Sequence, residues 1–203
     1  KVINKRLKKV SKKNKIYKKN SLSLEERNFS IELLKKNCSL FNYGPTGNKK
    51  DAVFNGIDDP GAHGLAFLLD QVKRKDSDIK ILASGQGADE IMSNISSYNF
   101  GKPNPKIFPE NLEDVFPWEN FYFGTQSSYL SKEESISGGF GIEGRYPFLD
   151  REVVQEYLWL LPELKNEEFK SPIVNFLKKN KYPYRKSNTL FHKNVSVKSG
   201  FNA

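Results

Sequence analysis

The residues best suited to chemistry lie in one short stretch, residues 84–90, which read Ser-Gly-Gln-Gly-Ala-Asp-Glu and follow the apolar run 79–83. Because glycine has no Cβ, the backbone N–H groups of such a loop can approach a phosphate closely. A carboxylate beside the loop can hold Mg²⁺, which prefers hard oxygen ligands and bridges to phosphate oxygens. The stretch therefore indicates a nucleotide with its metal at Asp89. A strand-to-helix corner with an acidic helix start would show the same pattern.

The elements that must position this loop alternate between helix and strand along the chain. Ser23, followed by two acids, is a good helix N-cap, and Asp59 caps a helix whose first residue is Pro60. In open parallel sheets, ligands bind at the carboxyl ends of strands, which is where the loop after Ala83 would lie. We expect an α/β fold with a strand at 79–83 and helices at about 24–37, 61–75, 89–98, 119–136, 151–161 and 170–180.

Composition limits the class of protein. The 203 residues are 37% hydrophobic and 13% aromatic, which is enough for a core. No apolar run approaches the roughly 20 residues that a membrane-spanning helix needs, so no membrane contact is expected. The single cysteine, Cys38, excludes an internal disulfide framework and favours a reducing, cytoplasmic compartment.

The net charge of +9 is concentrated at one end of the chain. Residues 1–20 carry ten Lys/Arg and no acid, whereas residues 21–203 are nearly neutral. We expect a basic tail or linker followed by one folded domain. Such a tail could bind nucleic acid electrostatically, but it holds one aromatic residue, Tyr17, so base stacking is not indicated. A solvated extension is favoured, and nucleic acid is not expected as a partner.

Three pieces of the sequence match motifs of one family in the same order. Residues 84–90 resemble a Ser-Gly-Glu-Gly-(Ser/Ala)-Asp-Glu loop, and residues 198–201, Lys-Ser-Gly-Phe, resemble a Lys-x-Gly-Phe motif. Residues 141–150 read Gly-Ile-Glu-Gly-Arg-Tyr-Pro-Phe-Leu-Asp and match Gly-(Val/Leu)-Glu-x-Arg-x-Pro-Phe-Leu-Asp almost residue for residue. The chain is thus similar to the synthetase domain of the asparagine synthetase family, whose relatives include β-lactam synthetases and lasso-peptide cyclases.

This resemblance implies a partial adenine-nucleotide alpha hydrolase-like (HUP) fold with a parallel sheet, many helices and a helix-rich C-terminal half. It implies that ATP activates a small-molecule carboxylate as an acyl-adenylate with release of pyrophosphate, after which an amine or ammonia attacks. The default product is asparagine, made with ammonia from a glutaminase domain that this chain does not contain. By the match, the nucleotide is bound by Ser84, Gly85, Gly87 and Asp89, Mg²⁺ by Asp89, and catalysis falls to Gln86 and Lys198.

The sequence departs from the family in two ways. The family's pyrophosphate loop, Ser-Gly-Gly-x-Asp-Ser, is not in the sequence; we expect it upstream of Lys1, on another polypeptide, or lost. Gln86 stands where asparagine-forming members have glutamate and β-lactam-forming members have tyrosine, and glutamine cannot exchange a proton near neutral pH. Three interpretations stay open: an asparagine-forming synthetase, which is favoured, a specialised relative, and a non-catalytic or nucleic-acid-binding relative.

Other polar residues near these motifs are expected to be structural. Glu143 and Arg145 are predicted to form a buried ion pair that fixes a turn, and Asp150 is predicted to cap a helix. Ordinary surface or core positions are expected for His63 and His192, and an exposed helical face for Glu133 and Glu134.

Overall fold

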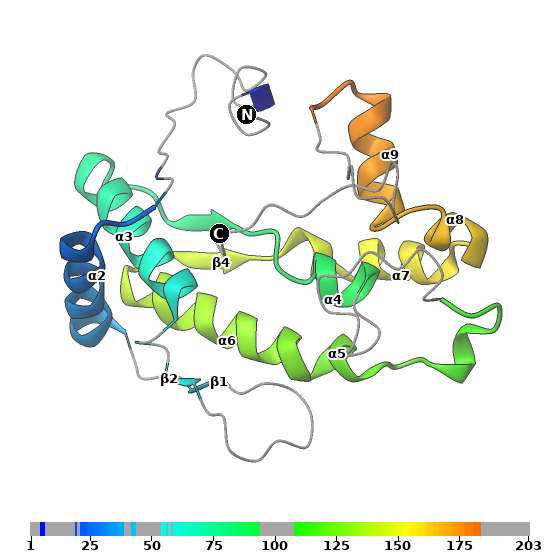
Figure 1. Ribbon diagram of the computed structural model, residues 1–203, viewed down its shortest axis with the longest axis horizontal. Helices are drawn as coiled ribbons and strands as arrows, with labels where there is room; N and C mark the ends of the chain where they lie inside the picture. The colour runs from blue at the N-terminus through cyan, green and yellow to red at the C-terminus, as the bar shows by residue number, and fades with distance from the viewer. Residues whose placement is uncertain are drawn as a thin grey trace. The chain divides into compact units, whose positions relative to one another are not determined.

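The computed structural model describes residues 5–6, 19, 21–38, 42–43, 54–55, 57, 59–93 and 108–183. Over these residues the protein is a helix-rich α/β protein, which confirms the α/β part of the predicted fold class (Figure 1). Contacts group the chain into two compact units. We call them the sheet unit (17–86, 122–147 and 200–203) and the helical unit (1–16, 87–121 and 148–199).

The sheet unit contains the two strands that carry the sequence motifs. Strand β3 (Ile81–Ala83) pairs in parallel with β4 (Glu143–Arg145). A second, antiparallel pair joins β1 (Asn42–Tyr43) to β2 (Phe54–Asn55). The helices of this unit are α2 (Leu24–Asn37), α3 (Pro60–Lys75) and α6 (Gly124–Gly139), and α3 packs against both α2 and α6. Their shared core consists of Leu34, Ala62, Ala66, Leu69, Ile136 and Ile142.

Helix starts in the sheet unit follow the predicted caps. Ser23 and Glu26 form a capping box at the start of α2, each side chain accepting a hydrogen bond from the other's backbone N–H. Asp59 caps α3 by accepting from the Gly61 N–H at 2.8 Å, and Pro60 takes the first helical position. Both predicted helices are confirmed, with α3 beginning one residue earlier than expected.

The helical unit has its own core. It contains α4 (Ala88–Met92), α7 (Arg151–Trp159), α8 (Pro162–Asn166) and α9 (Ser171–Lys179), with a 3₁₀ turn, η3 (Leu112–Asp114). Buried aromatic rings make edge-to-face contacts, which suit their quadrupoles. The core residues are Ile91, Met92, Phe108, Trp118, Phe121 and Tyr157. Two short elements, α5 (Glu119–Tyr122) and η4 (Pro147–Leu149), lie where the chain passes between units.

Other predicted helices also differ in their bounds, α9 by one residue at each end. The helix expected at 119–136 is split, because α5 ends at Tyr122 and α6 runs from Gly124 through Gly139. Helix α6 thus ends three residues beyond the predicted end. The helix expected to reach Leu161 ends at Trp159, since Pro162 pushes the preceding residue into extended backbone (Leu161 φ −60°, ψ 144°). Helix α4 runs from Ala88 to Met92 with Ser93 as its C-cap, so it is shorter than the helix expected at 89–98; residues 94–98 lie outside the described residues.

None of the helices in the described part of the chain has the length and apolar character that crossing a bilayer requires.

Candidate active site

Strands β3 and β4 bring two of the sequence motifs together. Ile81 lies opposite Glu143, and Ala83 lies opposite Arg145. The pairing continues one step further, because the Ser84 N–H donates to the Arg145 carbonyl at 2.8 Å. The two strands are parallel, so the loop that begins at Ser84 and the segment that begins at Tyr146 leave the sheet at the same edge (Figure 1).

The first half of the loop belongs to the sheet unit and is partly organised by its own side chains. The Ser84 hydroxyl accepts from the Gln86 N–H at 3.3 Å, which closes a small turn. Gly85 is exposed, and a Cβ placed on it would meet nothing within 4 Å. Its backbone therefore faces open space on that side, as the approach of a phosphate requires.

Gln86 reaches an acidic residue of α6. Its amide Nε2 donates to Glu133 Oε1 at 3.4 Å, a long hydrogen bond. The other carboxylate oxygen of Glu133 is buried and makes no hydrogen bond to any part of the chain that the structure describes. Glu133 is half-buried while Glu134 is exposed, so the predicted exposed face holds for Glu134 and is wrong for Glu133.

Tyr146 adds a hydroxyl to the same edge of the sheet. A Cβ on Gly144 would lie closer than 3.0 Å both to Glu134 Oε1 and to the Tyr146 hydroxyl, so these two groups lie together over that glycine. Burial, and then the carboxylates of Glu134 and Glu133, raise the pKa of Tyr146, because a phenolate would be desolvated beside like charge.

The second half of the loop opens the helical unit. Gly87 is the N-cap residue of α4 and adopts the left-handed conformation, with φ of 87°. A Cβ there would also lie closer than 3.0 Å to the Leu149 side chain. Asp89, in the first turn of α4, forms an ion pair with Lys170, with 2.8 Å between Oδ1 and Nζ. The carboxylate predicted to bind metal is thus held by a lysine.

Replacing Gly87 by alanine should destabilise the protein by about 1–3 kcal/mol, because a Cβ is strained in left-handed backbone and Leu149 would have to move. Gly85→Ala is the matched control, and its stability should change by less than about 0.5 kcal/mol because its Cβ enters open space. Urea unfolding of both variants without ligand measures the difference. Equal losses of unfolding free energy in the two variants would show that the left-handed conformation of Gly87 does not contribute to stability.

The remaining predicted residues have structural contacts or lie outside the described residues. Arg145 Nη1 contacts Glu143 Oε1 at 2.6 Å, but the side chains are 58% and 57% exposed, so the pair is not buried as predicted. They lie two residues apart on β4 and share its solvent-facing side.

Asp150 caps α7, accepting from the Glu152 N–H at 2.9 Å. His63 is a core residue bound to the Ile57 carbonyl. Lys198 and His192 lie outside the described residues.

No role was predicted from the sequence for Tyr146 or Lys170. Tyr146 could have been found from strand alternation, because it follows Gly144 by two residues and so shares its side of the strand. No local pattern links Lys170 to Asp89, since the two are far apart in the chain.

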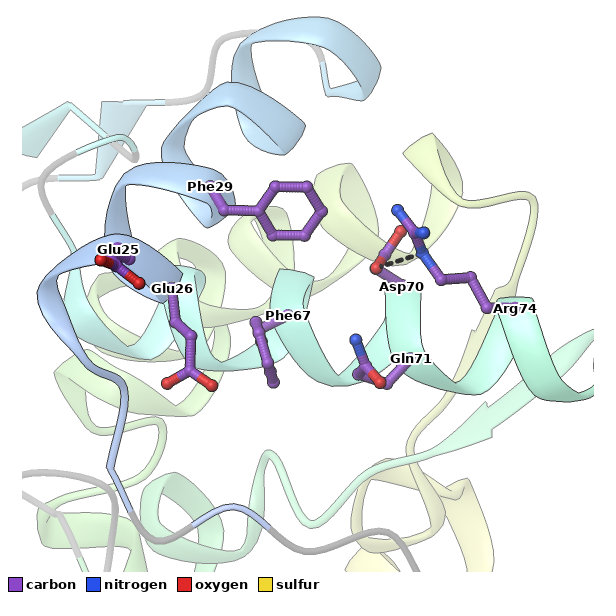
Figure 2. A pocket seen from close by; sticks show the side chains of 7 residues that line it. All are labelled: Glu25, Glu26, Phe29, Phe67, Asp70, Gln71 and Arg74. Atoms are coloured by element: carbon purple, nitrogen blue, oxygen red, sulfur yellow. Dashed lines mark hydrogen bonds and ion pairs between the residues drawn. The ribbon is translucent and has the colours of Figure 1, made fainter.

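A separate hollow of about 350 Å³ lies between α2 and α3 in the sheet unit (Figure 2). Phe29 and Phe67 contribute its aromatic surface, and Arg74 covers the Phe29 ring at 5.7 Å while pairing with Asp70 at 2.8 Å. The hollow is completed by Glu25, Glu26 and Gln71. None of the predicted site residues lines it.

Over the described residues, no group of three or more His, Cys, Asp or Glu side chains is arranged to hold a metal ion. Asp89 would be a single protein ligand. Its hard carboxylate oxygen suits an Mg²⁺ ion that takes its remaining ligands from phosphates and water. Comparisons with protein-family models, with curated proteins and with solved structures found no match.

Proposed function

We propose that this protein is an ATP-dependent, amide-forming ligase that works through an acyl-adenylate, with asparagine formed from aspartate as the default product. The observation that carries the proposal is the parallel pairing of β3 with β4. This pairing brings the motif loop at 84–87 to the same edge of the sheet as the part of the second motif that follows Arg145. The proposal includes a HUP-type fold and a cytoplasmic location.

The loop offers the features that a nucleotide phosphate needs. Gly85 leaves its backbone open to approach, and Ser84 supplies a hydroxyl next to it. Mg²⁺ bound with ATP at Asp89 would offset the charge that develops on the departing pyrophosphate. Lys198 keeps its proposed role toward the phosphates or the intermediate through the motif match alone.

The second half-reaction needs a proton acceptor, because an attacking amine must lose a proton as the amide forms. Gln86 cannot accept one. Glu133 can, since it is hydrogen-bonded to Gln86 and its second oxygen is buried without a hydrogen bond to a described residue. A catalytic role is one explanation for a buried polar atom in this state. In the proposed mechanism Gln86 orients the amine or the acyl carbonyl, and Glu133 takes the proton.

The amine source separates the favoured function from its nearest alternative. Ammonia supplied by a glutaminase domain gives an asparagine synthetase, whereas an amine within the substrate gives a cyclising relative of the β-lactam synthetase or lasso-peptide cyclase type. The alternative is kept because Gln86 stands where the asparagine-forming members have a glutamate that can exchange a proton.

Exchange of labelled pyrophosphate into ATP tests the adenylation step. The full-length protein with Mg²⁺ should catalyse this exchange only when the correct carboxylic acid is present, and aspartate is the first acid to examine. The second group of acids to examine consists of molecules that carry both a carboxylic acid and an amine able to attack it. Exchange with an acid of the second group and none with aspartate would assign the cyclising alternative. If no acid in either group supports exchange, the proposed function is wrong.

A further inference from the structure

Lys170 has an unusual backbone conformation for a residue with a side chain. It is the N-cap residue of α9, with φ of 54° and ψ of 48°, which is the left-handed region. Residues with a Cβ adopt this region rarely and at a cost, so the surrounding structure must hold Lys170 there. Its carbonyl accepts hydrogen bonds from the Ile173 and Val174 N–H groups at 2.9 and 3.1 Å, which fixes it to the start of α9.

This conformation accompanies a largely buried ion pair. The Lys170 and Asp89 side chains are 16% and 20% exposed, and 2.8 Å separates Nζ from Oδ1. The ammonium also lies 5.6 Å from the centre of the Phe169 ring, a cation–π contact. Both charged residues belong to the helical unit, so the pair is internal to it.

The ion pair affects what else Asp89 can bind. A divalent cation coordinating the Asp89 carboxylate needs Mg–O distances of about 2.0–2.1 Å. The ammonium already occupies Oδ1 at hydrogen-bond distance. Moving the ammonium away without a replacement anion would leave a largely desolvated cation, which is unfavourable. A nucleotide phosphate near Asp89 would supply such an anion.

We propose that Lys170 is a positioning residue that competes with divalent metal for Asp89, so that free metal is excluded and metal binds only together with the nucleotide. Without nucleotide, Lys170 neutralises Asp89 and holds the carboxylate in place. With nucleotide, the ammonium turns on its flexible stem to a phosphate oxygen and releases Asp89 Oδ1 from the ion pair. This inference rests on the proposed function only for the identity of the ligand that carries the metal.

Binding of Mn²⁺ without nucleotide, followed by the spin resonance of the free ion, tests this competition directly. The Lys170→Met variant should bind Mn²⁺ at least about 10-fold more tightly than the natural protein. Lys170→Arg keeps the cation and should match the natural protein. The double variant Lys170→Met with Asp89→Asn should lose the gain, because the freed carboxylate is gone.

Lys170→Gly separates the charge from the backbone strain. Glycine adopts the left-handed region freely, so this variant should fold at least as well as Lys170→Met and show the same gain in Mn²⁺ affinity. No gain in either variant, or a gain that persists in the double variant, would overturn the proposal. Pyrophosphate exchange by the natural protein is measured separately, so a failed Mn²⁺ result with normal exchange would reject this inference and leave the ligase proposal standing.

Discussion

Replacing Glu133 by glutamine is expected to slow amide formation by about 10²- to 10⁴-fold, the usual effect of losing a general base. The change keeps the size of the side chain and its ability to accept a hydrogen bond from Gln86. It removes the negative charge, and with it the capacity to take a proton. Because adenylate formation does not require a proton to leave the amine, acid-dependent pyrophosphate exchange should stay within a few-fold of the natural rate.

The two half-reactions therefore give different readouts for one substitution. Glu134→Gln is the matched control on the next residue of α6. Its side chain is exposed and lies beside Tyr146 and not beside Gln86, so amide formation should change far less. Loss of both half-reactions in Glu133→Gln, with an unchanged unfolding midpoint, would show that Glu133 does not act as the base of the second step.

Replacing Lys132 by methionine should destabilise the protein by about 3–5 kcal/mol. Lys132 Nζ lies 2.6 Å from Asp59 Oδ2, and the two side chains are only 11% and 9% exposed. Methionine fills much of the same space but removes the ammonium from a desolvated carboxylate. That carboxylate also caps α3, so its position affects the start of that helix.

Arg145→Met is the matched control for burial, because it breaks the exposed ion pair with Glu143 and should cost no more than about 1 kcal/mol. A double variant, Lys132→Met with Asp59→Asn, should lose less than the two single losses added together, because neither charge is then left in the interior. Urea unfolding of the natural protein, Lys132→Met, Asp59→Asn, the double variant and Arg145→Met gives these values. Similar losses of unfolding free energy for Lys132→Met and Arg145→Met would mean that the buried pair contributes no more to stability than the exposed pair.

The sequence predicts the local features of this fold well and the non-local ones poorly. Ser23, Asp59 and Asp150 were recognised as caps because a cap depends on a few adjacent residues. The role of Gly139 was not predicted, because it depends on another helix. It is the last residue of α6, and a Cβ there would lie closer than 3.0 Å to the Asn37 carbonyl, so the glycine allows close packing against the end of α2.

The candidate site shows the same limit. Residues 84–90 were identified from composition and motif, and the structure places the loop directly after β3 as expected. The contacts of Gln86 with Glu133 and of Asp89 with Lys170 depend on segments that are distant in sequence. Periodicity and propensity carry no information about such pairs, so the lysine partner of the predicted metal ligand could not be foreseen.

Amide hydrogen exchange across residues 84–90, with and without Mg·ATP, tests most directly whether this loop binds the nucleotide. If it does, the Gly85 and Gln86 amides should exchange more slowly when Mg·ATP is bound, because the phosphates then accept their hydrogen bonds. Unchanged exchange across the loop at a saturating concentration of Mg·ATP would contradict the account.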